Sequence, residues 1–314
     1  MVFDGVSLFL WQLGEVFKTQ DQASDLERFS NAVSSLKIAG VYVKVADGAV
    51  PFNLTRRTQA QWEDSGLRAL LEQISRCGLA KIGWHYLYGR EPEKEAERAL
   101  ERINRLGLQG YILDVEQEYK TAGSKAAELF MKRLRAGSSI PLALCSYRFP
   151  SLHREFPWQT FASWLDADKG DCHMPQVYWV GDRRENGPGL QYQRCHTELT
   201  AVKTLPLVPI GGLYSQSVNG QPWQPSRVQI QNFVQTARLL KCPGLSWWSW
   251  DSVTKADGPA EMTGTKVGWW QEIQQAAGLW KGELAEEKIT LETRVKQLET
   301  QAKLHGWTIE QMGG

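Results

Sequence analysis

Residues 110–118 read GYILDVEQE, a short apolar run with β-branched and aromatic residues that ends in acidic side chains. Such a run, bounded by turn-forming or polar residues, is typical of a buried strand in a parallel sheet. Seven other stretches have the same character, and helical sequence separates them from one another. They are GVSLFLWQL (5–13), AGVYVKVADG (39–48), KIGWHYLYG (81–89), IPLALCSY (140–147), MPQVYWVG (174–181), LPLVPIGGLYS (205–215) and GLSWWSWDS (244–252).

The intervals between these eight runs are long enough for right-handed helical crossovers. Gly78, Gly107 and Gly137 stand where three of the intervening helices should end. Alternating strands and helices, eight of each, predict an α/β fold of the (β/α)8 or TIM barrel type over residues 1–281. The helices are expected at 21–36, 58–77, 92–106, 122–136, 158–166, 192–203 and 226–240, with a last one from Trp269 to Trp280.

The sequence after residue 281 has a different composition. Glu, Lys, Gln and Thr dominate it, and Leu284, Leu291 and Leu298 recur seven residues apart. This spacing predicts an appended amphipathic, coiled-coil-like helix and tail over 282–314. Three heptads are few for a self-sufficient coiled coil, so docking of 282–304 on a protein partner or on the barrel is as well supported as self-association.

The overall composition excludes several classes of partner. The chain has 36 basic and 35 acidic residues, so no bulk field draws a nucleic acid or an anionic membrane surface. Its apolar amino terminus, MVFDGVSLFLWQLGEV, lacks a preceding basic residue and a cleavage site. We therefore expect a strand there rather than a Sec signal, no membrane span, and a cytoplasmic protein.

The cysteines and histidines do not predict a metal site. Five scattered cysteines in a long chain fit reduced thiols better than a disulfide framework. Two Cys-His pairs, at 172–173 and 195–196, lack the spacing of zinc ligands. No metal or other cofactor is expected.

The acidic residues of 110–118 are the leading candidates for catalysis, because catalytic groups in barrels come from the carboxyl ends of strands. Asp114, Glu116 and Glu118 alternate along the sequence and should project to one side, towards the barrel mouth. Close like charges raise the pKa of at least one carboxyl group, which can then act as the general acid that glycoside cleavage needs. The alternative is that Asp114 caps a turn or pairs with a base, and that Glu118 lies on a solvated loop.

The run ILDVE resembles the fourth-strand Asp-x-Glu of family 25 glycoside hydrolases, the lysozyme-type muramidases. Read as Asp-x-Glu-x-Glu, it is also similar to the Asp-x-Asp-x-Glu end of the family 18 chitinase signature, which would move the acid from Glu116 to Glu118. The run SWWSWDS resembles the part of those chitinases that holds their floor tryptophan, here Trp248. MPQVYW is only loosely similar to their Met-x-Tyr, because Met174 and Tyr178 are too widely spaced.

These resemblances imply general-acid cleavage of an amino-sugar polysaccharide such as peptidoglycan or a chitin-like chain. Glu116 would be the acid and Asp114 its assistant, and no metal would be required. Family 25 enzymes also carry an acidic residue in a Gly-Ile-Asp pattern on the first strand, where this chain has Ser7. That departure favours a second hypothesis, a catalytically silent carbohydrate-binding barrel that anchors an assembly. A lyase or isomerase is less favoured, because nothing resembles a phosphate-binding glycine loop or a Schiff-base lysine.

Six segments together resemble a group of barrel proteins described as glycoside-hydrolase-like, some of them associated with phage or phage-tail-like particles. This resemblance implies that the chain could be carried in such a particle instead of acting free in the cytoplasm. The segments are VKVADG, GWHYLYG, LDVEQEYK, LCSYRFPSLH, MPQVYW and SWWSWD.

Residues near the other predicted strand ends are of the types that bind sugars, with aromatic rings for ring faces and polar groups for hydroxyls. Any one of them, taken alone, is equally consistent with a core or rim position. His85 in particular is as typical of a hydrogen-bonded barrel residue. The candidate substrate-binding residues are Tyr178, Trp248, Gln176, Asp47, His85, Tyr147, Tyr214 and Asp251, with Lys44, Tyr86 and Arg148 beside them.

Overall fold

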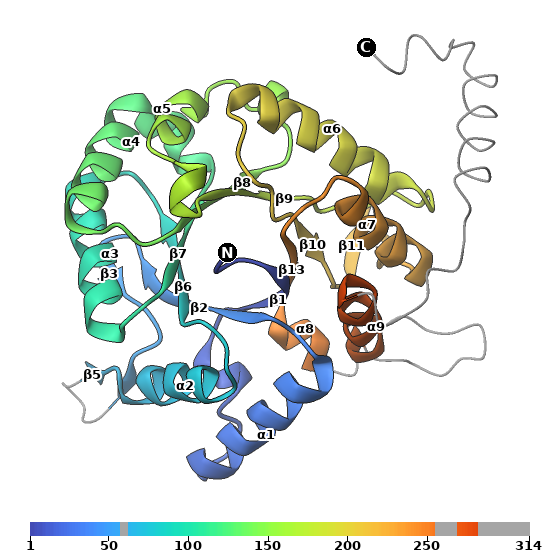
Figure 1. Cartoon of the computed structure of the whole chain (residues 1–314), viewed down its shortest axis with the longest axis horizontal. Helices are drawn as coiled ribbons and strands as arrows, with labels where there is room; N and C mark the ends of the chain where they lie inside the picture. Colours follow the sequence, from blue (N-terminus) through green and yellow to red (C-terminus); the bar gives the residue numbers. More distant parts are fainter. Residues whose placement is uncertain (57–61, 255–268, 282–314) are drawn as a thin grey trace.

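The computed structural model describes residues 1–56, 62–254 and 269–281. Within these residues, eight parallel strands close into one barrel, and the predicted (β/α)8 fold is confirmed (Figure 1). The strands are β1 (Gly5–Leu10), β2 (Gly40–Asp47), β6 (Ile82–Leu87), β7 (Gly110–Val115), β8 (Leu142–Tyr147), β9 (Cys172–Gln176), β10 (Ile210–Gly212) and β13 (Gly244–Trp248). Their order is β1-β13-β10-β9-β8-β7-β6-β2, and pairing of β2 with β1 closes the sheet.

Helices surround the barrel (Figure 1). The α-helices are α1 (Gln22–Leu36), α2 (Ser65–Arg76), α3 (Pro92–Leu106), α4 (Gln117–Gly137), α5 (Trp158–Ser163), α6 (Gly187–Val202), α7 (Arg227–Leu239), α8 (Trp250–Thr254) and α9 (Trp269–Lys281). The short 3-10 helices are η1 (Leu13–Glu15), η2 (Pro150–Leu152) and η3 (Ala167–Lys169). The predicted appended helix over 282–314, and with it the docking stripe, lies outside the described residues.

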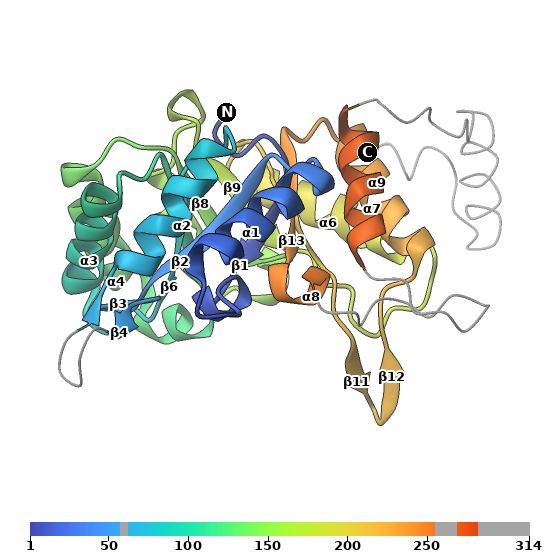
Figure 2. The ribbon, with the colours of Figure 1, turned by 90° about the horizontal axis from the view of Figure 1, so that it is seen from below.

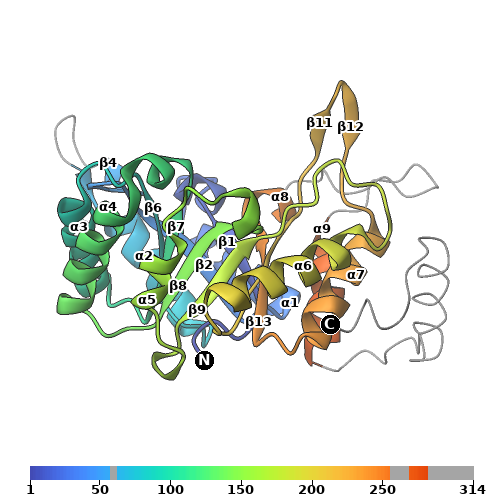
Figure 3. The ribbon, with the colours of Figure 1, turned by 90° about the horizontal axis from the view of Figure 1, so that it is seen from above.

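Two small hairpins and one short strand lie in the loops that follow the carboxyl ends of β2 and β10. The short strand, β3 (Val50–Pro51), pairs antiparallel with the end of β2. One hairpin joins β4 (Thr55–Arg56) to β5 (Trp62–Glu63), and the other joins β11 (Gln216–Val218) to β12 (Gln221–Trp223). Figures 2 and 3 show the β11–β12 hairpin standing well off the barrel, on the side away from the amino terminus.

The sequence of each barrel strand explains why the core has two parts. All six residues of β7 are buried, because alternate side chains face the barrel interior and the helices. The interior holds Phe9, Trp84, Ile112 and Cys145 among others, and Phe3 closes its amino end. The larger cluster lies between strands and helices.

No helix among the described residues is long and apolar enough to cross a bilayer.

Candidate active site

Two carboxyl groups meet at the carboxyl end of β7. Asp114 is on the strand, and Glu116 follows it as the residue that precedes α4. Gln176, at the end of β9, donates from Nε2 to Asp114 Oδ1 at 3.2 Å and to Glu116 Oε1 at 2.7 Å. Because β8 separates β7 from β9, this one amide joins both carboxyl groups from across a strand. We call Asp114 and Glu116 the carboxylate pair.

The environment of the carboxylate pair favours its protonated form. Asp114 is 7% exposed, and its burial, followed by the charge of Glu116, raises its pKa to about 8. Burial also raises the pKa of Glu116. Hydrogen bonds to Asp114 from Gln176 and from the Cys145 thiol, whose Sγ lies 3.2 Å from Oδ1, oppose this only in part. The pair therefore holds a proton near neutral pH, which is the condition for a carboxyl general acid.

Replacing Asp114 by Asn is expected to stabilise the protein at alkaline pH. The ordinary pKa of 3.8 applies to the unfolded carboxyl group, whereas the folded value is about 8. Between these values the folded state binds more protons, so the stability of the native protein falls as pH rises from about 4 to about 8. An amide avoids this cost, with an upper limit of roughly 5 kcal/mol. Urea unfolding at pH 5 and pH 8 should show the gain of Asp114→Asn growing with pH.

A control for this measurement is Glu97→Gln, since Glu97 is exposed on α3. Its effect on the free energy of unfolding should be small at both pH values. If Asp114→Asn were less stable than the wild type at pH 8, the carboxyl group would be stabilising as an anion, and the raised pKa would be wrong.

Glu118 does not lie at the strand end with the carboxylate pair. The alternation predicted for three acidic residues stops after two, because β7 ends at Val115 and Gln117 begins α4. Glu118 instead sits in the first helical turn, where its Oε2 accepts a hydrogen bond of 2.8 Å from the Tyr86 hydroxyl. The structure thus brings Glu118 near the site through Tyr86 of β6, whereas Glu116 accepts its hydrogen bond from Gln176, as Asp114 does.

A buried cation lies on β2. The register shifts between Lys44 and Ala46, so Lys44 and Asp47 face the same way although they are three residues apart. Their side chains form an ion pair of 2.9 Å. The Lys44 Nζ atom also lies 4.4 Å from the ring centre of Phe52 and 5.0 Å from that of Trp84. Aromatic faces stabilise such a desolvated ammonium group, and its charge works against the raised pKa of Asp114.

Aromatic side chains occupy other positions among the candidates. Trp248, half-buried at the end of β13, packs against Trp84 with ring centres 5.7 Å apart. Tyr178, also half-buried, lies edge-on to Tyr214 at 5.9 Å. Burial and neighbouring charges, those of the carboxylate pair among them, raise the pKa of Tyr178. The observed β9 ends at Gln176, so Tyr178 lies in the following loop and not on the strand predicted at 174–181.

The remaining candidates are spread around the barrel mouth. Burial, then the charges of Glu116 and Glu118, raises the pKa of Tyr147 to about 12, and its ring stacks on His153 at 3.7 Å. Asp251 belongs to α8, and its charge contributes to the raised pKa of Glu15 in η1. Asp251 is therefore grouped with the loop after β1 and not with the carboxylate pair.

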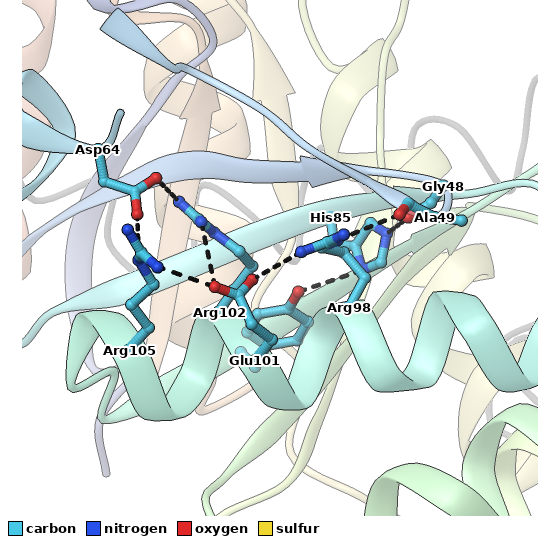
Figure 4. Close-up of polar contacts among 9 residues, drawn as sticks. Gly48, Ala49, Asp64, His85, Arg98, Glu101, Arg102 and Arg105 are labelled. Carbon is cyan, nitrogen blue, oxygen red and sulfur yellow. Dashed lines mark hydrogen bonds and ion pairs between the residues drawn. The ribbon is translucent and has the colours of Figure 1, made fainter. Parts of the chain in front are cut away.

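His85 is not part of the group at the mouth, which corrects the expectation that it binds substrate. Its neighbours Trp84 and Tyr86 face the barrel interior, so His85 faces the helices and is completely buried. Nε2 donates to the Gly48 carbonyl at 2.7 Å, and the Tyr111 hydroxyl donates to Nδ1 at 3.1 Å (Figure 4). Burial lowers its pKa to about 3, so the ring is neutral and can both donate and accept.

His85 supports the site from behind. Gly48 and Ala49 form the turn that follows Asp47, and Arg98 of α3 donates from Nε to the Ala49 carbonyl at 3.1 Å. His85 and Arg98 together hold this turn from its outer side (Figure 4). The position of Asp47 therefore depends on α3 as well as on β2.

Cys145 and Trp84 are site residues that the sequence reasoning missed. Both lie on inward-facing strand positions, Cys145 one residue from Leu144 and Trp84 one residue from His85. Strict alternation within IPLALCSY and KIGWHYLYG was the signal that could have found them.

Among the described residues, no group of three or more His, Cys, Asp or Glu side chains could hold a metal ion.

Comparison with solved structures identifies similar barrels. A GH113 β-1,4-mannanase matches with a TM-score of 0.62 and 12% identity, covering 90% of this chain and 100% of that one. A GH18 chitinase from Pseudoalteromonas aurantia matches with a TM-score of 0.57 and 12% identity, covering 87% and 99%. The spore cortex-lytic enzyme SleL from Bacillus megaterium gives a TM-score of 0.51 and 8% identity, covering 79% and 71%.

These identities are low, so the likeness shows the shared fold alone. The chain has the (β/α)8 barrel found in several glycoside hydrolases. No protein-family model and no curated protein matches the sequence. Because one fold serves many functions, the function of this chain depends on the residues of its site.

Proposed function

We propose that this chain is a glycoside hydrolase that cleaves an amino-sugar polysaccharide such as peptidoglycan or a chitin-like chain. The observation that carries the proposal is the carboxylate pair, joined by Gln176 at the carboxyl end of β7. Because the pKa values of both carboxyl groups are raised, the pair holds a proton near neutral pH. The cleavage of a glycosidic bond requires such a proton donor. Two of the solved structures with this fold are named as a chitinase and a cortex-lytic enzyme, which supports this class of substrate.

Glu116 is the general acid in this proposal. It is half-buried and less enclosed than Asp114, and so is better placed to reach a bound substrate. Its proton passes to the glycosidic oxygen as the bond to the anomeric carbon breaks. Asp114, on β7 and bridged to Glu116 by the same amide, tunes or assists Glu116, and the negative charge that remains after proton transfer lies on the Glu116 carboxylate.

The nucleophile is proposed to come from the substrate. The first barrel strand, GVSLFL, contains no carboxylate. Ser7 is 1% exposed and lies in mid-strand between Gly40 and Ser246. If the acetamido oxygen of the sugar attacks the anomeric carbon, no protein nucleophile is needed. Water then opens the cyclic intermediate, with Glu116 accepting its proton, and the products retain their anomeric configuration. Tyr178 and Trp248 would line the sugar site.

Incubation with colloidal chitin and with peptidoglycan, followed by assay of released reducing ends, tests this function. Hydrolysis of either polymer but not of β-mannan supports the proposal. Hydrolysis of mannan alone would assign a different substrate class, and NMR of the first-formed product would reveal inversion if the substrate-assisted route is wrong.

A second candidate function rests on Ser7. A barrel without an acidic residue on its first strand can bind a glycan without cleaving it. Binding of chitin or peptidoglycan fragments in calorimetry, together with no reducing ends from any polymer, would favour such a carbohydrate-binding barrel. Attachment to a phage-like or tail-like assembly through 282–314 would belong to this alternative and is tested by deleting that segment.

A further inference from the structure

Trp11 leaves a large apolar surface in water at the barrel mouth. It directly follows β1, and 44% of it is exposed. Other tryptophans of the described chain, such as Trp84, Trp179 and Trp247, are almost wholly buried. An exposed indole beside a candidate glycan site is the type of surface on which the apolar face of a sugar ring can stack.

The backbone around Trp11 is fixed by side chains from two directions. Glu15 accepts hydrogen bonds from the backbone N–H groups of Trp11 and Gln12, at 3.3 and 3.2 Å. Asn53 donates from Nδ2 to the Trp11 carbonyl at 2.9 Å and accepts from the Leu13 N–H at 3.0 Å. Glu15 is 8% exposed, so its carboxyl group is committed to this loop. The exposed indole is therefore carried on an ordered backbone, which lowers the entropic cost of binding.

The same contacts join Trp11 to the candidate active site. Asn53 Nδ2 also donates to the Lys44 carbonyl at 2.8 Å, and Lys44 forms the ion pair with Asp47. From the other side, the Trp84 indole donates to the Leu10 carbonyl at 3.1 Å. Trp84 packs in turn against Trp248. Trp11 thus belongs to the β1–β2 side of the same mouth, and β7 with the carboxylate pair lies three strands further round (Figure 1).

We propose that Trp11 is a stacking platform for one sugar ring of the polysaccharide, at a subsite removed from the bond that is cleaved. Asn53 and Glu15 are the positioning residues that hold it. This inference rests on the proposed glycan substrate and extends it, because a platform three strands from the carboxylate pair serves a chain of several sugars and not a monosaccharide. Trp11 should therefore contribute to the binding of long oligosaccharides and little to that of short ones.

Binding measured in a Glu116→Gln background tests the platform without turnover. Isothermal titration with N-acetylglucosamine dimer and hexamer should show that adding Trp11→Ala weakens hexamer binding about tenfold, because a stacking contact is lost. Dimer binding should change less than twofold. Trp11→Phe should recover part of the hexamer affinity, and thermal unfolding should be nearly unchanged in both variants, since the side chain is exposed.

Trp62→Ala is the matched control, because Trp62 is 59% exposed but lies on β5 beside α2 at the outer edge of the molecule (Figure 1). It should leave hexamer affinity unchanged. Three results would each overturn the platform. Trp11→Ala could leave hexamer affinity unchanged, Trp62→Ala could lose as much affinity as Trp11→Ala, or the Glu116→Gln protein could fail to bind the hexamer. Hydrolysis by the wild type is a separate measurement, so failure of the platform is distinguishable from failure of the proposed catalytic function.

Discussion

Glu116→Gln is expected to reduce the hydrolysis of amino-sugar polymers by about 10²- to 10⁴-fold. The amide keeps the shape of the side chain but has no proton to deliver to the leaving oxygen. Gln176 can still approach it, because the amide oxygen of the new residue can accept the hydrogen bond that now reaches Glu116 Oε1. Reducing-end assays with chitin and peptidoglycan should show the loss in kcat, with binding of oligosaccharides retained.

Glu118→Gln is the matched control, two residues away and of the same chemistry. Glu118 accepts a hydrogen bond from Tyr86, whereas Asp114 and Glu116 accept from Gln176, so replacement of Glu118 should lower hydrolysis by less than about tenfold. The opposite ranking would support the chitinase-like alignment, in which Glu118 is the acid and Glu116 its assistant. If both variants hydrolyse the polymers as fast as the wild type, neither Glu116 nor Glu118 takes part in the mechanism.

The barrel and its acidic strand end could be predicted because each depends on local sequence. Eight apolar runs with helical sequence between them specify the fold, and the strand period of two predicts that Asp114 and Glu116 project to one side, although Glu116 lies just past the end of β7. The same rule fails for Glu118, because the strand gives way to α4 at Gln117. For His85, alternation with the inward-facing Trp84 predicts an outward position, as the structure has it.

Other parts of the site depend on contacts that a single sequence does not reveal. The shift in register within β2 turns Lys44 and Asp47 to one side, and no residue type marks it. Gln176 reaches the carboxylate pair from two strands away, about sixty residues along the chain. Asn53 joins the loop after β1 to β2 through its side-chain amide. Such side-chain contacts are set by tertiary packing and not by local pattern.

Arg102→Met is expected to destabilise the protein by about 3–5 kcal/mol, the range for breaking a buried ion pair by removing one partner. Arg102 of α3 and Asp64, which precedes α2, are each 2% exposed at the side chain, and Arg102 donates to Asp64 at 2.5 Å (Figure 4). Although burial opposes it, the hydrogen bond and charge of Arg102, with the charge of Arg105, lower the pKa of Asp64. Without Arg102, the Asp64 carboxylate keeps only the half-exposed Arg105 as an ion-pair partner among the described residues.

Urea unfolding of Arg102→Met, Asp64→Asn and the double variant measures this loss, and the double variant should be less destabilised than the sum of the two single variants. Arg133→Met is the control, because its ion pair with Glu97 also involves α3 but is about half-exposed on both sides, and its loss should cost about 0–1 kcal/mol. Equal effects of Arg102→Met and Arg133→Met would show that burial adds nothing to the pair.

The network continues from Arg102 through Glu101 to Arg98 and the turn after Asp47 (Figure 4). Arg102→Met should therefore also weaken substrate binding at temperatures where the variant is still folded, whereas Arg133→Met should not.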